Sequence, residues 1–259
     1  MKSSRKLMIK NYVKIGFLAG LFSLYACSSS YTVTGIEGGR VAMTEVYDKD
    51  PDAGAAALLR TYQLRIDSIM SPVVGHSAAS LTSYRPESPL SNLMADVIKL
   101  SASRLTGESV DVAVMNMGGI RSSLSEGEIT YGDIFEIAPF ENTLCLLTME
   151  GTSLQKLFEQ IAALHGEGLS GARLVISKDG ELLNATVGGK AIDPKAVYRV
   201  ATIDYLAEGN DKMSAFLEAK SKTLPAHGLL RDVLLNYVKE CEQKGKFVQA
   251  EVEGRVVVK

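Results

Sequence analysis

The sequence predicts a mixed α/β fold, an α+β arrangement with mixed sheets rather than a doubly wound one. Several segments carry apolar residues at helical spacing, and short apolar or alternating runs typical of strands lie between them. These segments do not follow the repeated strand–helix–strand order of a doubly wound sheet. With 259 residues, 46% of them hydrophobic and 22% charged, the chain can bury a core, and its composition argues against disorder over most of its length.

The N-terminus has the features of an export signal. Lysine and arginine lie among the first residues, and residues 15–26 form an uncharged, mostly apolar stretch, shorter than the roughly 20 residues of a membrane span. The stretch ends in Leu24, Tyr25, Ala26 and Cys27, which resembles a bacterial lipobox. The resemblance implies that residues 1–26 are a lipoprotein signal peptide and that lipidated Cys27 anchors the exported protein to a bacterial cell membrane, facing the periplasm or the surface. The alternative is an ordinary secretory signal in which Cys27 is incidental.

Residues 27–72 are predicted to be a tether and N-terminal extension with a helix. The tether is polar, carries Gly and Ser, and contains a short strand-like piece at residues 40–46. Residues 53–70 are rich in helix formers and repeat apolar residues at helical spacing, and Pro72 ends this helix. The repeating residues are Leu58, Leu59, Tyr62, Ile66 and Ile69.

Residues 73–259 are predicted to form one domain. A β-like run covers residues 73–81, and a short apolar run at residues 111–115 predicts a buried strand. The later elements are a short element at 130–137, a strand at 143–149, a helix ending at 164, a hairpin at 172–187 turning at Asp179 and Gly180, a turn at Gly188 and Gly189, a strand at 198–205, a helix at 229–244 and a strand at 254–258.

Two helices of this domain carry start signals. Ser88 suits an N-cap and Pro89 suits the first helical position, and the apolar residues that follow recur at i, i+3, i+4 and i+7. Thr152 and Gln155 have the spacing of a capping box, which predicts that the helix ending at Leu164 begins beside Thr152.

Charge and cysteine usage narrow the classes of partner and site. The net charge is −2 and no run of Lys and Arg occurs beyond the first residues, so no nucleic acid partner is expected. Cys145 and Cys241 lie far apart in sequence, in apolar surroundings, and are expected to be small buried thiols rather than halves of a disulfide.

The first segment that can carry chemistry follows the buried strand and reads Asn116-Met117-Gly118-Gly119-Ile120-Arg121. Its glycines allow a sharp bend and a close approach to a ligand. Arg121 adds a planar fork of donors suited to carboxylate, phosphate or ribose oxygens. The spacing is neither a dinucleotide fingerprint nor a phosphate-binding loop. The alternative interpretation is a tight turn with a surface arginine.

Two later segments can contact a nucleobase and a ribose. Phe140 follows Pro139 at the entrance of a strand, and its face can stack on a base while the Asn142 amide reads a base edge. Tyr205 can supply a second stacking face, and Asp211 can accept hydrogen bonds from ribose hydroxyls because an ionised carboxylate only accepts. In the alternative interpretation the two rings are core or strand-end residues, and Asn142 and Asp211 are turn residues.

Five segments follow one another in a specific order over roughly residues 73 to 258. They are Ser88-Pro89-Leu90-Ser91-Asn92-Leu93-Met94-Ala95-Asp96, then Asn116 to Arg121, then Tyr131-Gly132-Asp133, Ala138-Pro139-Phe140-Glu141-Asn142 and Thr202-Ile203-Asp204-Tyr205. This order resembles the C-terminal domain of the 5′-nucleotidase family. In that family the domain holds the nucleoside, so the resemblance implies an α/β/β/α sandwich that binds a nucleoside or nucleotide.

The resemblance also assigns roles to residues. It implies that Phe140 and Tyr205 sandwich the base, that Asn142 contacts the base, that Asp211 holds the ribose and that Arg121 lines the substrate. A further arginine ahead of the first helix commonly helps, and Arg85 is its nearest candidate. The full set of expected substrate contacts is Arg85, Asn116, Gly118, Gly119, Arg121, Phe140, Asn142, Tyr205 and Asp211.

The sequence departs from the family pattern at three places. The loop before Asp211 is usually richer in glycine than Glu208-Gly209-Asn210. The second ring is usually phenylalanine, and Tyr205 keeps the flat face while adding a hydroxyl. Glu141 stands where the family often has glycine, and its charge can repel a phosphate.

Enzymes of this family hydrolyse phosphate esters with two metal ions held by a separate N-terminal domain, which needs clustered carboxylates and imidazoles. This chain has three histidines, His76, His165 and His227, which are widely dispersed, and no Cys-x-x-Cys pair that would predict a zinc site. The stretch between Cys27 and residue 73 is shorter than the ~100 residues of a typical domain. No cofactor or metal site is therefore expected in this chain, and divalent metals are expected only in a partner metallophosphatase domain.

Three hypotheses about function follow. In the first, which the sequence favours, the chain is the substrate-binding part of a split 5′-nucleotidase, inactive alone, and a separate metallophosphatase chain supplies catalysis. In the second, it is a stand-alone nucleotide-binding lipoprotein. In the third, the fold is kept as a structural or interaction module that binds no nucleoside.

Overall fold

The computed structural model describes residues 32–259 and divides the chain into two units, one ending at Ala53 and one formed by Gly54–Lys259. The predicted signal peptide and Cys27 lie outside the described residues. In the first unit, every residue from 32 to 52 is exposed and the regular element is a 3₁₀ helix, η1 (Glu45–Lys49). The strand expected at residues 40–46 is wrong, because this exposed segment pairs with no neighbouring strand that could take its backbone hydrogen bonds. Among the described residues, no helix combines the length and apolar character that crossing a bilayer requires.

The second unit begins with the long helix expected from the sequence. Helix α2 (Ala53–Met70) has no buried residue, so its apolar stripe is exposed to solvent. Strand β1 (Val73–Ser77) follows Pro72 and pairs antiparallel with β3 (Gly127–Thr130). The strand predicted at residues 73–81 thus ends early, and Leu81 forms an isolated bridge with Leu124.

A five-stranded sheet forms the centre of the domain. Its strands lie in the order β10-β4-β9-β2-β5, with β2 and β9 parallel and the other neighbours antiparallel. Every residue of β2 is buried, as its unbroken apolar run predicts. The bounds of the five strands are β2 (Val112–Met115), β4 (Leu144–Glu150), β5 (Gly168–Ser170), β9 (Val197–Ile203) and β10 (Ser221–Thr223).

A four-stranded sheet, in the order β11-β6-β7-β8, contains the hairpin predicted at residues 172–187. The hairpin turns through Gly180, whose φ of 86° is left-handed and favours glycine. The C-terminal strand β11 returns to pair parallel with β6. The bounds are β6 (Ala172–Ile176), β7 (Leu182–Val187), β8 (Lys190–Ala191) and β11 (Val256–Val258).

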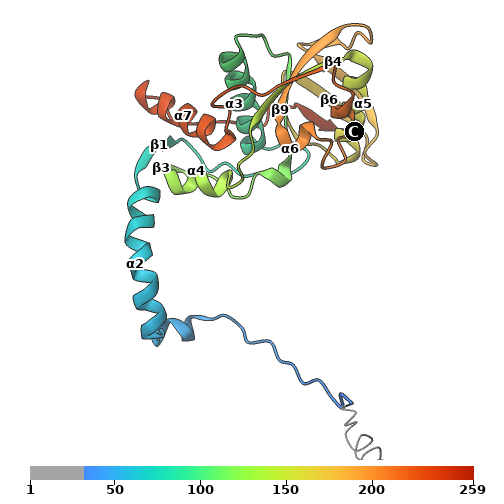
Figure 1. The fold of residues 1–259 in the computed structure, drawn as a ribbon. Helices are drawn as coiled ribbons and strands as arrows, with labels where there is room; N and C mark the ends of the chain where they lie inside the picture. The colour runs from blue at the N-terminus through green and yellow to red at the C-terminus, as the bar shows by residue number, and fades with distance from the viewer. Residues whose placement is uncertain (1–31) are drawn as a thin grey trace, which may run out of the picture. The chain divides into compact units, whose positions relative to one another are not determined.

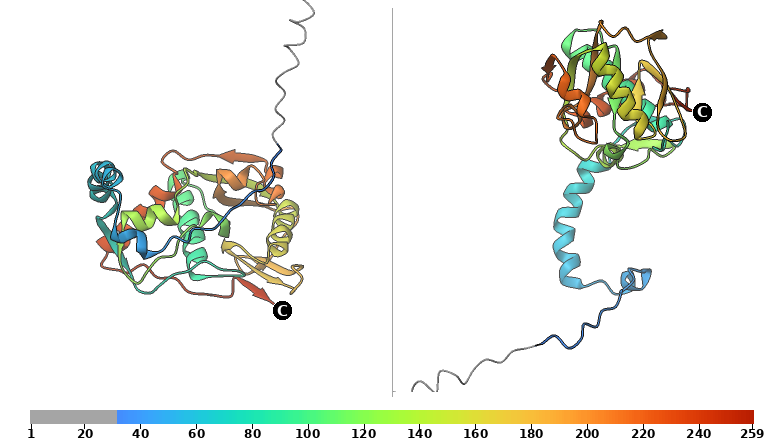
Figure 2. Two further views of the ribbon diagram at one scale, coloured as in Figure 1. Left: turned by 90° about the horizontal axis from the view of Figure 1, so that it is seen from below. Right: turned by 90° about the vertical axis from the view of Figure 1, so that its right-hand side faces the viewer.

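Helices cover the five-stranded sheet on both sides. Helix α3 packs on β2 and β5 and contacts α7, and α5 contacts β4 together with the smaller sheet. Figure 1 shows α3 and α7 on one side of β4 and β9 and α5 on the other, and α5 faces the viewer in the right-hand view of Figure 2. The helices are α3 (Pro89–Thr106), α4 (Tyr131–Ile137), α5 (Gly151–Ala163), α6 (Asp204–Ala207) and α7 (Leu230–Gln243), with η2 (Met117–Gly119) and η3 (Ser214–Glu218) as 3₁₀ helices.

The helix starts agree with the sequence at α3 and differ from it at α5. Ser88 caps α3 and accepts from the Ser91 N–H at 3.4 Å, with Pro89 in the first turn as expected. Helix α5 begins earlier than predicted, after Glu150, and shows no side-chain cap, so the capping box expected at Thr152 is wrong. The cause is tertiary: Gly151 packs so tightly that an added Cβ would lie 2.0 Å from the Asp193 carbonyl oxygen, and its N–H donates to Ala196.

A buried carboxylate, that of Glu87, fixes the C-terminal segment to the start of helix α3. Glu87 accepts from the Asn92 amide at 2.7 Å and from three backbone N–H groups, those of Glu253, Arg255 and Val256. Burial raises the pKa of Glu87, but these four hydrogen bonds lower it more, so that the pKa lies below its ordinary value. The charged form of Glu87 therefore contributes to the stability of the fold.

Cys145 and Cys241 are free thiols, as expected, but the full burial expected for both holds only for Cys145. Cys145 is fully buried in β4, whereas Cys241 is half-buried in α7.

Candidate functional site

Seven of the nine predicted contact residues line one cavity of about 300 Å³. The size is at the lower end of the ~300–1,000 Å³ of pockets for small organic ligands. The residues come from three places: η2 after strand β2, the loop before β4, and α6 with the loop that follows it. They are Asn116, Gly118, Gly119, Phe140, Asn142, Tyr205 and Asp211.

The glycines of η2 have different surroundings. An added Cβ on Gly119 would lie 2.7 Å from both the Asn116 Oδ1 and the Met115 Cε, so a side chain there would force these two packed side chains to move. A Cβ on Gly118 would meet its nearest atoms only at 3.9 Å, namely the Asn116 Nδ2 and the Asp211 Oδ2. Gly118 therefore leaves space beside the Asp211 carboxylate, and a ligand can approach the backbone there.

Phe140 presents a large exposed ring at the cavity, with 48% of its surface accessible. The loop that carries it is held from behind by Arg231, which donates to the Pro139 carbonyl at 3.3 Å and lies 4.5 Å from the Phe135 ring centroid. The Asn142 carbonyl accepts from the Leu230 N–H at 2.8 Å. These contacts fix the backbone on either side of Phe140 and leave its ring free to stack.

Tyr205 provides a second aromatic face in the lining, with 42% of its surface accessible. Its hydroxyl donates to Asp211 Oδ1 at 2.9 Å, and the Asn116 amide donates to Asp211 Oδ2 at 2.6 Å. The hydrogen bond to Asp211 raises the pKa of Tyr205, because deprotonation would break the bond and place a second negative charge beside the carboxylate. The carboxylate thus lies beside the cavity with both oxygens oriented by neighbours.

The two predicted arginines lie outside the cavity lining. The Arg121 guanidinium lies 6.0 Å from the Phe140 ring centroid and donates to the Gly118 carbonyl at 3.1 Å. Arg121 therefore contacts two residues that line the cavity, Phe140 and Gly118. Arg85 donates to the Gly166 carbonyl at 2.9 Å and forms an ion pair with the buried Glu167. The contact of Arg85 with a ligand therefore stays a prediction.

Glu167 supports the site in a way that the sequence analysis missed. Its carboxylate is buried and accepts from Arg85 on one oxygen and from the Met117 N–H on the other. Burial raises the pKa of Glu167, while these two contacts lower it, and the net shift is upward. Because Met117 opens η2, Glu167 anchors the glycine turn through this backbone hydrogen bond. No spacing signal connects a residue on the β5 side of the sheet with this turn; only the fold brings them together.

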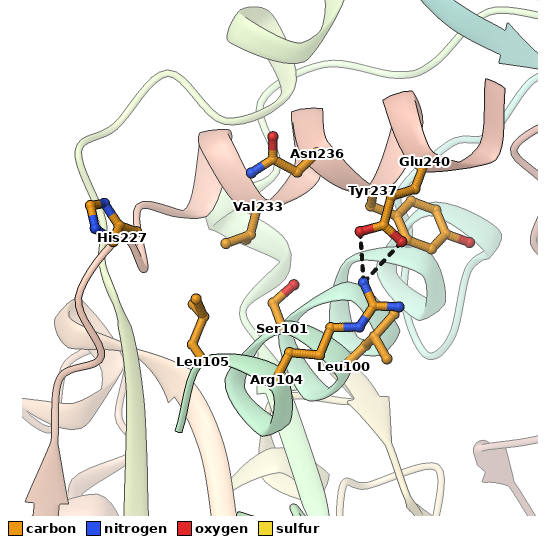
Figure 3. A pocket seen from close by; sticks show the side chains of 9 residues that line it. All are labelled: Leu100, Ser101, Arg104, Leu105, His227, Val233, Asn236, Tyr237 and Glu240. Carbon is orange, nitrogen blue, oxygen red and sulfur yellow. Dashed lines mark hydrogen bonds and ion pairs between the residues drawn. The ribbon is translucent and has the colours of Figure 1, made fainter. Parts of the chain in front are cut away.

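A second, smaller groove of about 160 Å³ lies between α3 and α7. Figure 3 shows His227 at one end and the Arg104–Glu240 ion pair at the other, with Nη1 of Arg104 2.8 and 2.9 Å from the two carboxylate oxygens. Its lining contains one phenyl-type ring, Tyr237, and the imidazole of His227 lies at the far end of the groove from it, whereas the larger cavity is lined by both Phe140 and Tyr205. The larger cavity is the better candidate site.

A metal centre does not fit the described part of the chain. Between residues 32 and 259, no group of three or more His, Cys, Asp or Glu side chains is placed to hold an ion. His76 Nδ1 instead forms a hydrogen bond of 3.0 Å with Glu242 Oε2, and the imidazole stacks on Phe247 with ring centroids 5.7 Å apart.

Comparison with known proteins identifies the family. The family model described as "5′-nucleotidase, C-terminal domain" matches residues 72–218. The chain belongs to the 5′-nucleotidase family. The resemblance deduced from the sequence is confirmed, as is the mixed α/β fold.

Three relatives illustrate the similarity. The chain is 33% identical to Protein UshA of Yersinia enterocolitica over 132 aligned residues. The aligned region covers 49% of this chain and 23% of the relative. It is 32% identical over 166 residues to Endonuclease YhcR of Bacillus subtilis, covering 61% of this chain and 13% of the relative. The crystal structure of the 5′-nucleotidase precursor from Thermus thermophilus is similar with a TM-score of 0.69 and 27% identity, over 79% of this chain and 43% of that one. The chain thus spans less than half the length of each of these relatives.

Proposed function

We propose that this chain binds the nucleoside part of a nucleotide, as the recognition part of a split 5′-nucleotidase. The observation that carries the proposal is the single cavity in which Phe140, Tyr205, Asn142 and Asp211 meet from separate elements. Two flat aromatic faces, an amide and a carboxylate form the set of groups that a base linked to a ribose requires.

Each group has a task in holding the nucleoside. Stacking of a base on an aromatic ring contributes roughly 1–3 kcal/mol per base, and it tolerates different bases because each has a π-face. The Asn142 amide offers both a donor and an acceptor to a base edge, and Asp211 accepts from ribose hydroxyls. The open space at Gly118 lets the sugar approach the backbone beside Asp211.

The proposal places hydrolysis of the phosphate ester on a separate metallophosphatase chain. Bound divalent ions would supply the hydroxide and neutralise charge on the phosphate there. The family model that matches this chain is that of the C-terminal domain of a 5′-nucleotidase, and the chain covers 43% of the Thermus structure. What the residues described here contribute is orientation of the nucleoside and, with it, of the ester attached to it.

Anchoring by a lipid on Cys27 is the second part of the proposal, and it rests on the lipobox-like sequence Leu24-Tyr25-Ala26-Cys27. Mass spectrometry of the mature N-terminus tests it: a diacylated or triacylated Cys27 is expected after expression in a bacterium, and Cys27→Ser is expected to shift the protein out of the membrane fraction. An unmodified Cys27 in the wild-type protein would contradict the anchor.

The binding proposal is tested by isothermal titration calorimetry of the chain with adenosine, guanosine, cytidine and their 5′-monophosphates. Saturable binding is expected for at least one nucleoside, and ribose 5-phosphate, which has no base to stack, is expected to give no measurable heat. Heat with none of the nucleosides or nucleotides would refute nucleoside recognition and leave the fold as a structural module.

Phosphate release tests the division of labour. With Mg²⁺, Mn²⁺ or Zn²⁺ present, the chain alone is expected to release no phosphate from the nucleotide that it binds, and release is expected on adding a metallophosphatase chain from the same organism. Rapid hydrolysis by the purified chain alone would refute the split arrangement. Binding without activation by any such partner would favour a stand-alone nucleotide-binding protein.

A further inference from the structure

The loop that carries Asp211 is held in an unfavourable backbone conformation. Asp211 has a φ of 51° and Lys212 a φ of 63°, so two successive residues with side chains lie in the left-handed region. This region favours glycine, because a Cβ comes close to the following carbonyl oxygen there. Non-glycine residues persist in it where surrounding contacts impose the conformation.

Side-chain hydrogen bonds impose it here. The Asn210 amide donates to the Tyr205 carbonyl at 2.8 Å, and the Tyr205 hydroxyl donates to Asp211 Oδ1 at 2.9 Å. From the opposite wall, the Asn116 amide donates to Asp211 Oδ2 at 2.6 Å. The loop is thereby tied at Asp211 to α6 on one side and to the end of β2 on the other. A phenylalanine at position 205 could not make the hydroxyl bond.

These hydrogen bonds orient the Asp211 carboxylate but do not use all of its acceptor positions. Each carboxylate oxygen has about two acceptor positions, and each oxygen of Asp211 receives one hydrogen bond from the protein. One acceptor position on each oxygen stays open for a ligand, and Asp211 lines the cavity. A vicinal pair of hydroxyls can occupy both positions, whereas a ligand without hydroxyls leaves them unused.

We propose that the Tyr205 hydroxyl is a latch that holds Asp211 in place to select ligands with ribose hydroxyls, while the ring of the same residue stacks on the base. Tyr205 is then a positioning residue for the sugar as well as a wall of the base site. The inference rests on the proposed function, because it takes the cavity to hold a nucleoside. The raised pKa of Tyr205, caused by its hydrogen bond to Asp211, is consistent with a phenol that donates at neutral pH.

The test compares Tyr205→Phe, which removes the hydroxyl and keeps the ring, with Tyr198→Phe. The Tyr198 hydroxyl also takes part in one hydrogen bond of 2.9 Å, accepted from the Asp193 N–H, but it lies outside the cavity lining. Kd is measured by calorimetry for a ribonucleoside and for its 2′,3′-dideoxy form. A hydrogen bond to a charged group is stronger than one between neutral groups. Its loss in Tyr205→Phe should therefore weaken ribonucleoside binding by about 10-fold. Binding of the dideoxy form should change by less than about 2-fold, because stacking is kept.

A second readout needs no ligand. In the free protein, amide hydrogen exchange over residues 210–213 should be about 10-fold faster in Tyr205→Phe than in the wild type, because the loop loses one of its ties. Tyr198→Phe should leave that exchange rate unchanged. In an Asp211→Ala background, Tyr205→Phe should have no further effect on ribonucleoside affinity, since the hydroxyl acts through Asp211.

The outcomes separate the latch from the proposed function. Faster exchange together with a selective loss of ribonucleoside affinity supports the latch. An unchanged exchange rate, or equal losses for the ribo and dideoxy ligands, overturns it. If the wild-type chain binds no nucleoside at all, the proposed function fails, sugar selection fails with it, and the exchange rate alone decides whether the hydroxyl orders the loop.

Discussion

Replacing Phe140 with alanine removes one of the two aromatic faces in the cavity and leaves the rest of the lining in place. Because the ring is 48% exposed, its loss opens no enclosed void in the core. The contacts that hold its loop, the Arg231 bond to the Pro139 carbonyl and the Leu230 N–H bond to Asn142, involve backbone carbonyls that the substitution does not touch. The folded protein also loses the contact of Arg121 with the ring, worth roughly 0.5–1 kcal/mol at an exposed site.

Binding should respond far more strongly than folding. Loss of a stacking face costs about 1–3 kcal/mol, which corresponds to a roughly 5- to 150-fold higher Kd. Calorimetry measures the Kd, and urea unfolding checks that stability falls by no more than about 1 kcal/mol. Phe247→Ala is the matched control, since Phe247 is an exposed ring outside the cavity lining. Equal affinities of Phe140→Ala and the wild type would refute the assignment of Phe140 as a stacking face.

Three further predictions concern the fold and its thiols. Glu87→Gln should lower the free energy of unfolding by about 2 kcal/mol in urea denaturation, because buried hydrogen bonds to a charged group are lost. Since the folded pKa of Glu87 is lowered, its contribution is present above the unfolded carboxyl pKa of about 4.3 and should disappear as pH falls further, so wild type and variant should converge in acid. Gly119→Ala should destabilise the protein by about 1–3 kcal/mol, whereas Gly118→Ala, whose Cβ has space, should change stability little; similar losses in both would contradict the packing described for η2. Burial raises the pKa of the Cys145 thiol to about 11, so iodoacetamide at pH 8 should label Cys241 first and Cys145 only on unfolding, as read by peptide mass spectrometry, and rapid labelling of Cys145 would contradict its burial.

The sequence was informative wherever one segment determines its own structure. Helices α2 and α3 and the β6–β7 hairpin follow from local periodicity, a capping residue and a turn glycine, and they were found within a few residues. Strands β5 and β10 were missed, because three residues acquire strand structure only by pairing with β2 and β4. The start of α5 was misplaced for a similar reason, since Gly151 packs against a distant backbone.

In the candidate site, too, the sequence indicated single residues but not the contacts that depend on the fold. The residues that line the cavity were found because glycines, exposed rings and an acceptor at loop positions are unusual enough to be noticed singly, and their order along the chain resembled a family. What could not be found were the partners of these residues. Glu167 beneath the glycine turn and the Tyr205–Asp211 bond depend on distances in space between residues that no periodicity links. Arg85 was expected at the ligand, but its guanidinium is paired with Glu167, a residue far along the chain.

A crystal structure of this chain soaked with the nucleoside that binds it most tightly is the most direct test of the account. The base is expected between Phe140 and Tyr205, at contact distances of about 3.5–4.0 Å from both rings, with the sugar hydroxyls at Asp211. Density for the nucleoside in the groove between α3 and α7, or a base that touches neither ring, would contradict nucleoside recognition by this cavity.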